Sequence, residues 1–525
     1  MLLFLSIPSY LTFKKMKKIY FILLITSSIN VVAQNPDDAL RTAWFTFNGS
    51  ARNMATGGVM GSLGGDITAA HVNPAGLGLF KTSEFILSPG FNLNNNKFSF
   101  RGKDTSNQKN NFNYGTMGFV FGTPHRSKNS KWASSAFSFS VNQLANYNNR
   151  TQFKGFNNQS SFTEQYLEEL ISDRADTNAA LSNYIFGSSL AFRTFLIDTI
   201  RGAAGQVLGY QSLVPISTGI NQMYDAATRG GYHEVAIGVA TNLEDKLYMG
   251  GSITIPIVSY QRSLVYSETD ATTNNNNDFK SFEYKEDFKS TGFGIGAKLG
   301  IIYKPQEFWR LGFAVHTPQA ITFTDEIRAS MIANTENYAG TKSENSDALN
   351  SGNAGIRKYS TLTPWRAIAS GSYVFREIKD TRKQRAFISA DIEYVNYRGA
   401  RFYTVDEEDQ AGKNYLNQVN SEVKDYYKGN FNFRVGGELK LHTWMLRLGG
   451  AYYGSPYNDD NLKASRTVAT GGLGYRNHGI FIDLAYAHTF NQDVVFPYRL
   501  NNKPNTFAEQ TGSRGNIMLT VGFKF

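Results

Sequence analysis

The chain has 525 residues, no cysteine and a formal net charge of +10. The lack of cysteine excludes a disulfide framework, a thiol nucleophile, a cysteine-based metal site and a lipoprotein anchor. Aromatic residues make up 14% of the chain and 48 residues are glycine, yet the mean hydropathy is only −0.35. This mixture argues against a helical membrane protein and is typical of a transmembrane β-barrel, whose strands show every second side chain to lipid.

The positive charge is unevenly distributed along the chain. Lys14, Lys15, Lys17 and Lys18 lie in residues 1–33, which contain no acid, and removing these four lysines lowers the net charge from +10 to +6. The remaining charges are scattered, so we expect no nucleic-acid partner. An acidic lipopolysaccharide surface and other outer-membrane lipids are the expected electrostatic neighbours.

Residues 1–33 have the features of a secretory signal peptide. The lysines are followed by the apolar run Ile19 to Ile29 and by small residues, so that cleavage after Ala33 leaves Gln34 first. The apolar run is too short to span a bilayer. Met16 is an alternative start codon.

The segment from Gly49 to Phe80 is too rich in glycine and alanine to build a core alone. Glycine loses the most backbone entropy on ordering and has no side chain to bury, so such a segment needs surroundings that already enclose it. We therefore predict that residues 34–83 form a hatch inside a barrel. Three readings stay open for residues 35–48, which include Trp44, Phe45 and Phe47: a mobile N-terminus, a short helix entering the hatch, or a disordered tail.

This segment resembles the N-terminal hatch of the FadL/TodX family of outer-membrane transporters for long-chain fatty acids and other hydrophobic compounds. The matching residues are Arg52, Gly57, Gly58, Gly61, Asp66 and the NPA motif Asn73, Pro74 and Ala75. The resemblance continues in the stretches that begin at Tyr303, Asp391 and Phe433, and is thinnest across 94–230 and 325–360. It implies an all-β, antiparallel barrel of about fourteen strands, closed by the hatch.

Residues 84–525 carry the predicted barrel. About a dozen runs alternate apolar and polar residues, most clearly Leu247 to Ile257 and Phe293 to Tyr303. The last run ends on Phe525, as expected of a strand that the barrel assembly machinery recognises. Because hydrocarbon offers no hydrogen-bond partner, the last strand must pair with the first.

Residues 157–230 do not follow this alternation of apolar and polar residues. Apolar residues at intervals of three and four predict two amphipathic helices, Phe162 to Asp173 and Ala179 to Leu196. Bacterial barrels carry their long loops outside, so the helices belong to an extracellular loop. The resemblance implies a hydrophobic groove there that captures substrate; a lid that shields the mouth is the alternative. Residues 270–278 and 334–360 contain few apolar residues and are predicted to be solvated loops.

Charged residues on the opposite parity from the apolar rows are expected in the lumen. Arg366, Arg434 and Arg447 are the preferred candidates to anchor the carboxylate of an amphipathic ligand, with Lys298 and His316 as further ligand-binding candidates. The alternative is that such charges pair with one another and with the hatch. For Arg52 that alternative is favoured, and Asn73, Pro74 and Ala75 are read as a structural turn or a moving part.

The sequence offers no sign of an enzyme. It has no GxSxG elbow, no phosphate-binding GK[ST] and no HExxH arrangement, so we expect no catalytic residues, no metal and no cofactor. We predict a monomeric outer-membrane channel of a Gram-negative bacterium for passive uptake of hydrophobic or amphipathic molecules such as fatty acids. The alternative is a barrel for adhesion or surface structure, or a general porin.

Overall fold

The computed structural model describes residues 36–125, 130–375 and 385–525. The predicted signal peptide, residues 1–33, and the cleavage site lie outside these residues. Within them, no helix is both long and apolar enough to cross a bilayer.

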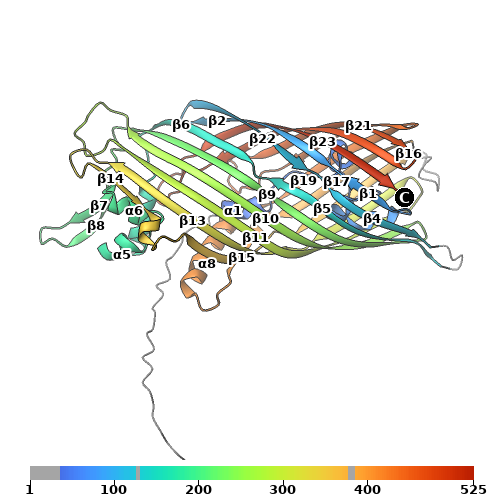
Figure 1. Cartoon of the computed structure of the whole chain (residues 1–525), viewed down its shortest axis with the longest axis horizontal. Helices are drawn as coiled ribbons and strands as arrows, with labels where there is room; N and C mark the ends of the chain where they lie inside the picture. The colour runs from blue at the N-terminus through green and yellow to red at the C-terminus, as the bar shows by residue number, and fades with distance from the viewer. Residues whose placement is uncertain (1–35, 126–129, 376–384) are drawn as a thin grey trace, which may run out of the picture.

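A closed antiparallel sheet dominates the molecule (Figure 1). Fourteen spans of the described chain follow one another around it, and β23 pairs with both β22 and the first span, which closes the ring. Six spans are broken in two: β1 (Glu84–Leu87) with β2 (Pro89–Phe100), β3 (Lys103–Tyr114) with β4 (Met117–Pro124), β5 (Trp132–Asn146) with β6 (Asn149–Asn157), β12 (Trp309–His316) with β13 (Ala320–Asn334), β15 (Gly355–Leu362) with β16 (Arg366–Phe375), and β17 (Ala386–Asn396) with β18 (Arg401–Thr404). Eight are continuous: β9 (Ile220–Leu243), β10 (Leu247–Asp270), β11 (Ser281–Tyr303), β19 (Gly429–Leu441), β20 (Trp444–Tyr453), β21 (Ser465–Asn477), β22 (Ile480–Val495) and β23 (Ala508–Lys524). The predicted closed barrel is confirmed.

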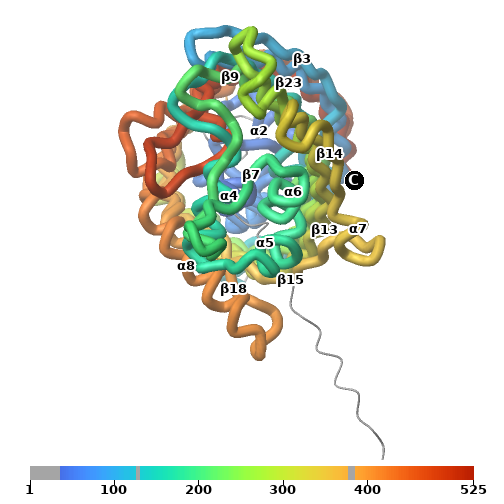
Figure 2. Tube along the Cα trace, turned by 90° about the vertical axis from the view of Figure 1, so that its left-hand side faces the viewer, coloured from blue at the N-terminus to red at the C-terminus, as the bar shows by residue number. Residues whose placement is uncertain are grey.

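Most of the remaining elements lie inside the barrel or beyond its extracellular end. Figure 2 looks into that end and shows the N-terminal segment within the ring and the helical loop across the mouth. The inner elements are α1 (Asp37–Arg41), α2 (Ala51–Ala55), α3 (Ala69–Val72) and the 3₁₀ helix η1 (Pro74–Leu79). The outer ones are α4 (Glu164–Ser172), α5 (Thr177–Ser182), α6 (Ser188–Arg193), the hairpin β7 (Ile197–Arg201) and β8 (Val207–Ser212), β14 (Thr341–Asn345), α7 (Ser346–Leu349) and α8 (Gln410–Tyr426). The short 3₁₀ helix η3 (Tyr397–Gly399) lies in the wall itself, at the break between β17 and β18.

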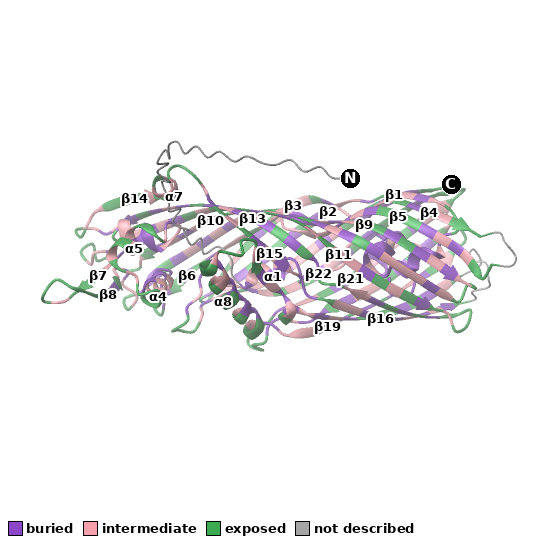
Figure 3. Cartoon of the chain, turned by 90° about the horizontal axis from the view of Figure 1, so that it is seen from below, coloured by how far each residue is buried: buried purple, intermediate pink, exposed green. Residues whose placement is uncertain are grey.

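Side chains alternate across the wall as the period of two predicts (Figure 3). On β11, Phe293 and Leu299 are 62% and 63% exposed, whereas Lys298 on the opposite parity is 5% exposed. Such a row of exposed aliphatic and aromatic residues is stable only against lipid. Aromatic residues mark both edges of the apolar band: Trp309 and Trp444 begin strands at the periplasmic edge, while Trp365 packs beside Tyr394 at the other, with ring centroids 5.4 Å apart.

Two sequence expectations need correction. The helix predicted from Ala179 to Leu196 is two short helices, α5 and α6, because the chain turns between Asn183 and Gly187. Residues 334–360 are not wholly a solvated loop, since they include β14, α7 and the start of β15, which pairs with β13. The outward residues of β15 mix polar Lys358 and Ser360 with apolar Ile356, which is 62% exposed, so the alternation is hard to see in the sequence.

Candidate functional site

The hatch begins as a short helix tied to its own chain and to the wall. Ser50 caps α2 by accepting the Asn53 N–H at 3.1 Å, and its hydroxyl donates to Asp66 at 2.6 Å. Arg52 donates to the carbonyl of Gly65 at 2.9 Å and lies 3.4 Å from the wall carboxylate of Glu438. The geometry of Arg52 is that of a hatch-pinning residue.

The NPA turn fastens the hatch to the wall. The Asn73 side-chain oxygen accepts the Ala75 N–H at 3.1 Å, while its amide donates to the carbonyls of Gly61 at 2.5 Å and Ile301 at 3.2 Å. Pro74 starts η1 at a position where a missing N–H costs nothing. The wall makes room with glycine, because a Cβ at Gly300 would lie 1.8 Å from the Asn73 oxygen.

Wall donors satisfy the carbonyls that end α3. The last carbonyls of a helix have no partner within it. Here Ser252 donates to Ala70 O at 2.8 Å, Lys298 to His71 O at 2.9 Å and His316 to Val72 O at 2.7 Å. Lys298 and His316 thus hold the hatch in this structure.

Buried acids flank these donors. The His71 ring lies 2.8 Å from Glu234, which Lys298 also contacts at 2.5 Å and to which Gln319 donates at 2.6 Å. Asp391 accepts two hatch N–H groups, those of Met60 and Gly61, each at 3.1 Å. The wall therefore holds the hatch through charged side chains rather than through apolar packing alone.

Arg447 is the most tightly held of the predicted anchors. Its guanidinium donates to Glu438 and to Asp483, both at 2.6 Å, and the residue is 2% exposed. Arg447 is on β20 and its two carboxylate partners are on β19 and β22, away from the cavity described next.

The other two arginines are held more loosely. Arg366 lies 3.6 Å from Glu393 and stacks on Phe45, 4.6 Å from the ring centroid. Arg434 lies 3.8 Å from both Asp391 and Glu393, and two of its buried guanidinium nitrogens, Nε and Nη2, make no hydrogen bond within the described residues. Donors left over in this way are suited to a ligand or to ordered water.

A cavity of about 80 Å³ lies between the hatch and the N-terminal segment. Four of the five predicted lumen residues line it, Arg366, Arg434, Lys298 and His316, and Arg447 does not. Aromatic side chains complete the lining: Phe45, Phe47, Tyr232 and Tyr453. This volume holds a few waters or a carboxylate head group but not a long acyl chain. Among the described residues, no group of three His, Asp or Glu side chains is placed to share a metal ion.

The roof of the cavity is formed by residues 36–48, for which the sequence allowed three alternative structures. It enters the barrel as the short helix α1, with Leu40 and Trp44 buried in an aromatic cluster. Arg499 pairs with Asp37 at 2.9 Å, and Arg466 lies 3.9 Å from the Trp44 ring centroid. In the sequence, the aromatic residues Trp44, Phe45 and Phe47 indicate that this segment is ordered, because exposing them to water would be unfavourable.

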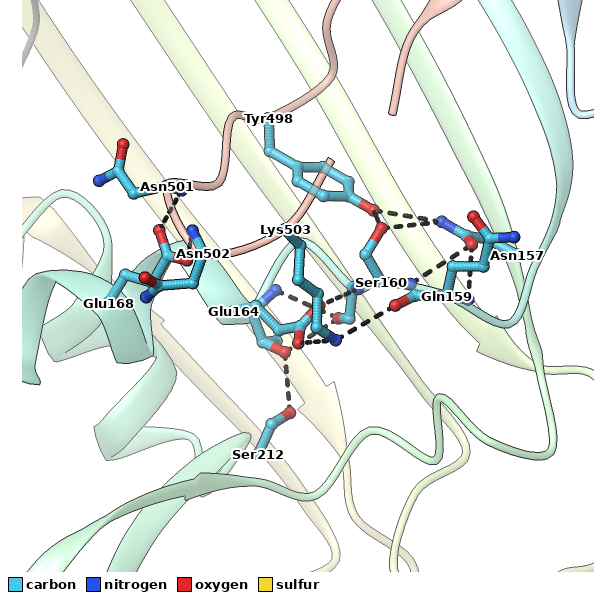
Figure 4. A network of polar contacts seen from close by, with 12 residues as sticks. Asn157, Gln159, Ser160, Glu164, Glu168, Ser212, Tyr498, Asn501, Asn502 and Lys503 are labelled. Carbon is cyan, nitrogen blue, oxygen red and sulfur yellow. Dashed lines mark hydrogen bonds and ion pairs between the residues drawn. The ribbon is translucent and has the colours of Figure 1, made fainter. Parts of the chain in front are cut away.

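The extracellular loop is latched to the last loop of the chain (Figure 4). Glu168 on α4 accepts the backbone N–H groups of Asn501 and Asn502 at 2.7 and 3.0 Å. Lys503 pairs with Glu164 at 2.6 Å. Sequence reasoning did not find this latch, since its partners are more than 300 residues apart.

One seam of the wall lacks a backbone ladder. Within the described chain, β3 pairs with β2 and β6 with β9, but β3 and β6 do not pair with each other. Side chains bridge them instead: Asn107 donates to Gln152 O at 3.0 Å and Asn111 to Asn148 O at 3.3 Å. The seam lies where the second and third spans break.

No family model and no curated protein matches this sequence. Solved structures match the fold. A FadL homologue of Pseudomonas aeruginosa has 14% identity and a TM-score of 0.55, and the match covers 92% of this chain and 100% of that one. The toluene transporter TbuX of Ralstonia pickettii has 17% identity and a TM-score of 0.49 (91% and 98% covered), and the toluene transporter TodX of Pseudomonas putida has 14% and 0.49 (92% and 100% covered). A fourteen-span barrel with an N-terminal hatch inside it is the architecture that the sequence resemblance implied, and this chain has the FadL fold.

Proposed function

We propose that the protein is an outer-membrane channel for the passive uptake of hydrophobic or amphipathic small molecules, with long-chain fatty acids as the first class to test. The cavity above the hatch carries this proposal. It combines a base with spare donors, Arg434, with the aromatic faces of Phe45, Phe47 and Tyr232. A carboxylate head group fits this chemistry, since guanidinium forms strong charge-assisted hydrogen bonds with it.

The route has three stages. Exposed apolar residues near the tip of the extracellular hairpin, Ile200, Val207 and Leu208, provide the first contact for a hydrophobic molecule. Displacement of the segment that holds Phe45 then enlarges the lumen cavity, because 80 Å³ is too small for an acyl tail. Release follows through a shift of the hatch or through the β3–β6 seam.

Two kinds of protein with similar folds support this class of cargo. The solved structures include toluene transporters and a channel for monoaromatic hydrocarbons. Localisation in the outer membrane of a Gram-negative bacterium, export by a signal peptide, action as a monomer and contact with lipopolysaccharide belong to the same proposal. The rival proposal is a barrel of this build for adhesion or general diffusion.

Uptake of labelled fatty acid by cells and by liposomes containing the purified protein tests the proposal. We expect that deleting the gene lowers uptake and that Arg434→Ala weakens fatty-acid binding about tenfold, the loss of one charge-assisted contact. Arg229→Ala, an exposed arginine on β9, is the matched control. Uptake unchanged by the deletion would favour the rival, and wild-type affinity in Arg366→Ala, Arg434→Ala and Arg447→Ala would remove the anchor.

A further inference from the structure

An apolar groove of about 1030 Å³ lies on the outer surface of the barrel, across β4, β5 and β9 to β12. Phe121, Phe137 and Val239 form one side, and Leu299, Ile301 and Phe313 the other. The groove is deepest at Gly251, which points outward there with no side chain; a Cβ at this position would meet only Leu299, at 3.2 Å, and the Lys298 carbonyl at 3.7 Å. The volume lies at the upper end of the range for ligand pockets.

The groove ends near the periplasmic edge of the apolar band. Met249, in its lining, is three residues from Lys246, and Ile301 is three residues from Lys304. At about 3.3 Å per residue, the lysine backbones lie roughly 10 Å from Met249 and Ile301. Exposed Trp132 and Tyr303 lie at the same edge, where aromatic residues mark the membrane interface.

Positive charge gathers at this end of the groove. The Lys304 N–H donates to the Lys246 carbonyl at 2.8 Å, which places the two residues side by side, and Lys246 is exposed. Two acids of the neighbouring turn lie among these lysines: Glu244 is 3.6 Å from Lys131, and Asp245 is 3.2 Å from Lys81 and also interacts electrostatically with Lys304. The four lysines outnumber these two acids. Glu307, in the next turn, offsets only part of the excess.

We propose that this groove binds an acyl chain of an anionic phospholipid from the periplasmic leaflet, with the phosphate at Lys246 and Lys304. The apolar lining and its depth in the band match the chain, and the lysines at its end match the head group. The site is independent of transport, since it requires only that the barrel spans a membrane.

The lipid would lie opposite the hatch. A Cβ at Gly250, next to Gly251, would come within 2.5 Å of the Pro74 backbone, and a Cβ at Gly78 within 2.9 Å of the Thr241 carbonyl. Only the thickness of the sheet therefore separates the bound chain from the NPA turn. The lipid would cover the part of the wall against which that turn packs.

Native mass spectrometry of the purified full-length protein with added phosphatidylglycerol or phosphatidylethanolamine tests the site. We expect one retained phosphatidylglycerol, with at least fivefold less phosphatidylethanolamine. Gly251→Leu fills the groove and should lower retention at least fivefold. Gly471→Leu is the matched control, because a Cβ there meets Leu448 at 3.4 Å and the Arg447 carbonyl at 3.8 Å, outside the groove.

A second variant tests the head-group contact without touching the wall. The double variant Lys246→Gln, Lys304→Gln should lose the preference for phosphatidylglycerol. The control variant Lys154→Gln, at an exposed position on β6, should keep this preference. Equal retention in the Gly251→Leu and Gly471→Leu proteins would overturn the proposal. Displacement of phosphatidylglycerol by an equal concentration of laurate would also overturn it, since the groove would then take free acyl chains.

Discussion

Arg447 shows what a buried charge in the wall does. Its two carboxylate partners, Glu438 and Asp483, are 3% and 1% exposed. Glu438 also lies 3.4 Å from Arg52, whereas no other base of the described residues pairs with Asp483, so Asp483 is the charge that loss of Arg447 leaves uncompensated. Removing one partner of a buried ion pair costs about 3–5 kcal/mol, because the remaining charge is left uncompensated. We therefore expect Arg447→Met to lower the stability of the barrel by about this amount.

The measurement is urea unfolding of the barrel in detergent, followed by its shift in gel mobility. Arg229→Met, at an exposed position, should change the unfolding free energy little. The double change of Glu438→Gln and Asp483→Asn in the Arg447→Met protein should recover part of the loss. If Arg447→Met alone unfolds like the parent protein, the ion pairs do not stabilise the wall.

Asn73 has two roles that substitution can separate. Asn73→Asp keeps the oxygen that accepts the Ala75 N–H but loses the amide that donates to Gly61 and Ile301. A buried acceptor left without its donor costs about 1–3 kcal/mol. We expect faster hydrogen exchange across residues 57–80 in Asn73→Asp, measured by mass spectrometry. Asn110→Ala, at an exposed position on β3, is the control. Hydrogen exchange at the parent rate in Asn73→Asp would show that the Asn73 amide does not hold the hatch.

The sequence predicted whether a side chain points to the lumen or to lipid better than it predicted which residue that side chain contacts. Alternation placed Arg434, Glu438 and Arg447 in the lumen, because a charge against lipid is costly. The Glu438–Arg447 pair follows from the tight turn at 442–443, which makes these residues directly opposite. By contrast, the contact of Lys298 with Glu234 joins β11 to β9 across β10, and no local rule specifies that distance.

At the scale of elements, α4 carries an acid whose protonation is coupled to folding of the loop. Burial raises the pKa of Glu169 from 4.5 to about 7, and the Ser188 hydroxyl that donates to it offsets only part of this. The folded loop therefore binds this proton more tightly than the open loop does. The resulting stabilisation is complete below about pH 4.5 and decreases as the pH rises to about 7.

Hydrogen exchange of α4 to α6 at several pH values, corrected for intrinsic rates, measures this effect. We expect protection to fall between pH 4.5 and 7 in the parent protein, and Glu169→Gln to remove the dependence. Glu407→Gln, in the exposed loop before α8, should leave it in place. Equal pH profiles for the parent and Glu169→Gln would assign the dependence to other groups.

Elements inside the apolar band were predictable and those outside it were less so. On β10 and β11 the outward rows of isoleucine and phenylalanine reveal the strands. On β15 the outward residues include Lys358 and Ser360, which water accommodates, so the period of two is hidden. The latch between α4 and Asn501–Lys503 depends on loop conformation, which propensities do not determine.

At the scale of the molecule, the wall is uneven in height. Strands β9 and β10 each have 24 residues, whereas β20 has 10, so the wall extends farther beyond the apolar band on one side. The helical loop starts from this taller side and covers the mouth (Figure 2). With the hatch below and α1 between them, three layers of the described chain lie across the lumen. Under the proposed function, passage along the lumen requires movement of these layers.

Movement of the hatch can be tested directly, since the chain has no cysteine of its own. The hydroxyls of Ser62 in the hatch and Ser370 in the wall lie 2.7 Å apart, close to the spacing that a disulfide needs. We expect the Ser62→Cys, Ser370→Cys protein to take up substrate when reduced and to lose at least tenfold in rate when oxidised. The measurement is uptake into liposomes before and after addition of a reductant.

A crosslink within the wall separates hatch movement from general stiffening. The hydroxyls of Ser372 and Ser389, on neighbouring strands β16 and β17, lie 2.9 Å apart. A disulfide between cysteines at these two positions joins strands that already pair. Because the Ser372 hydroxyl also contacts Ser62 of the hatch, the control compares the oxidised with the reduced form of the same protein, and oxidation should leave its uptake unchanged. If the oxidised hatch protein also transports at the reduced rate, the hatch stays in place during passage. Substrate would then have to leave through the β3–β6 seam, where side chains alone bridge the strands.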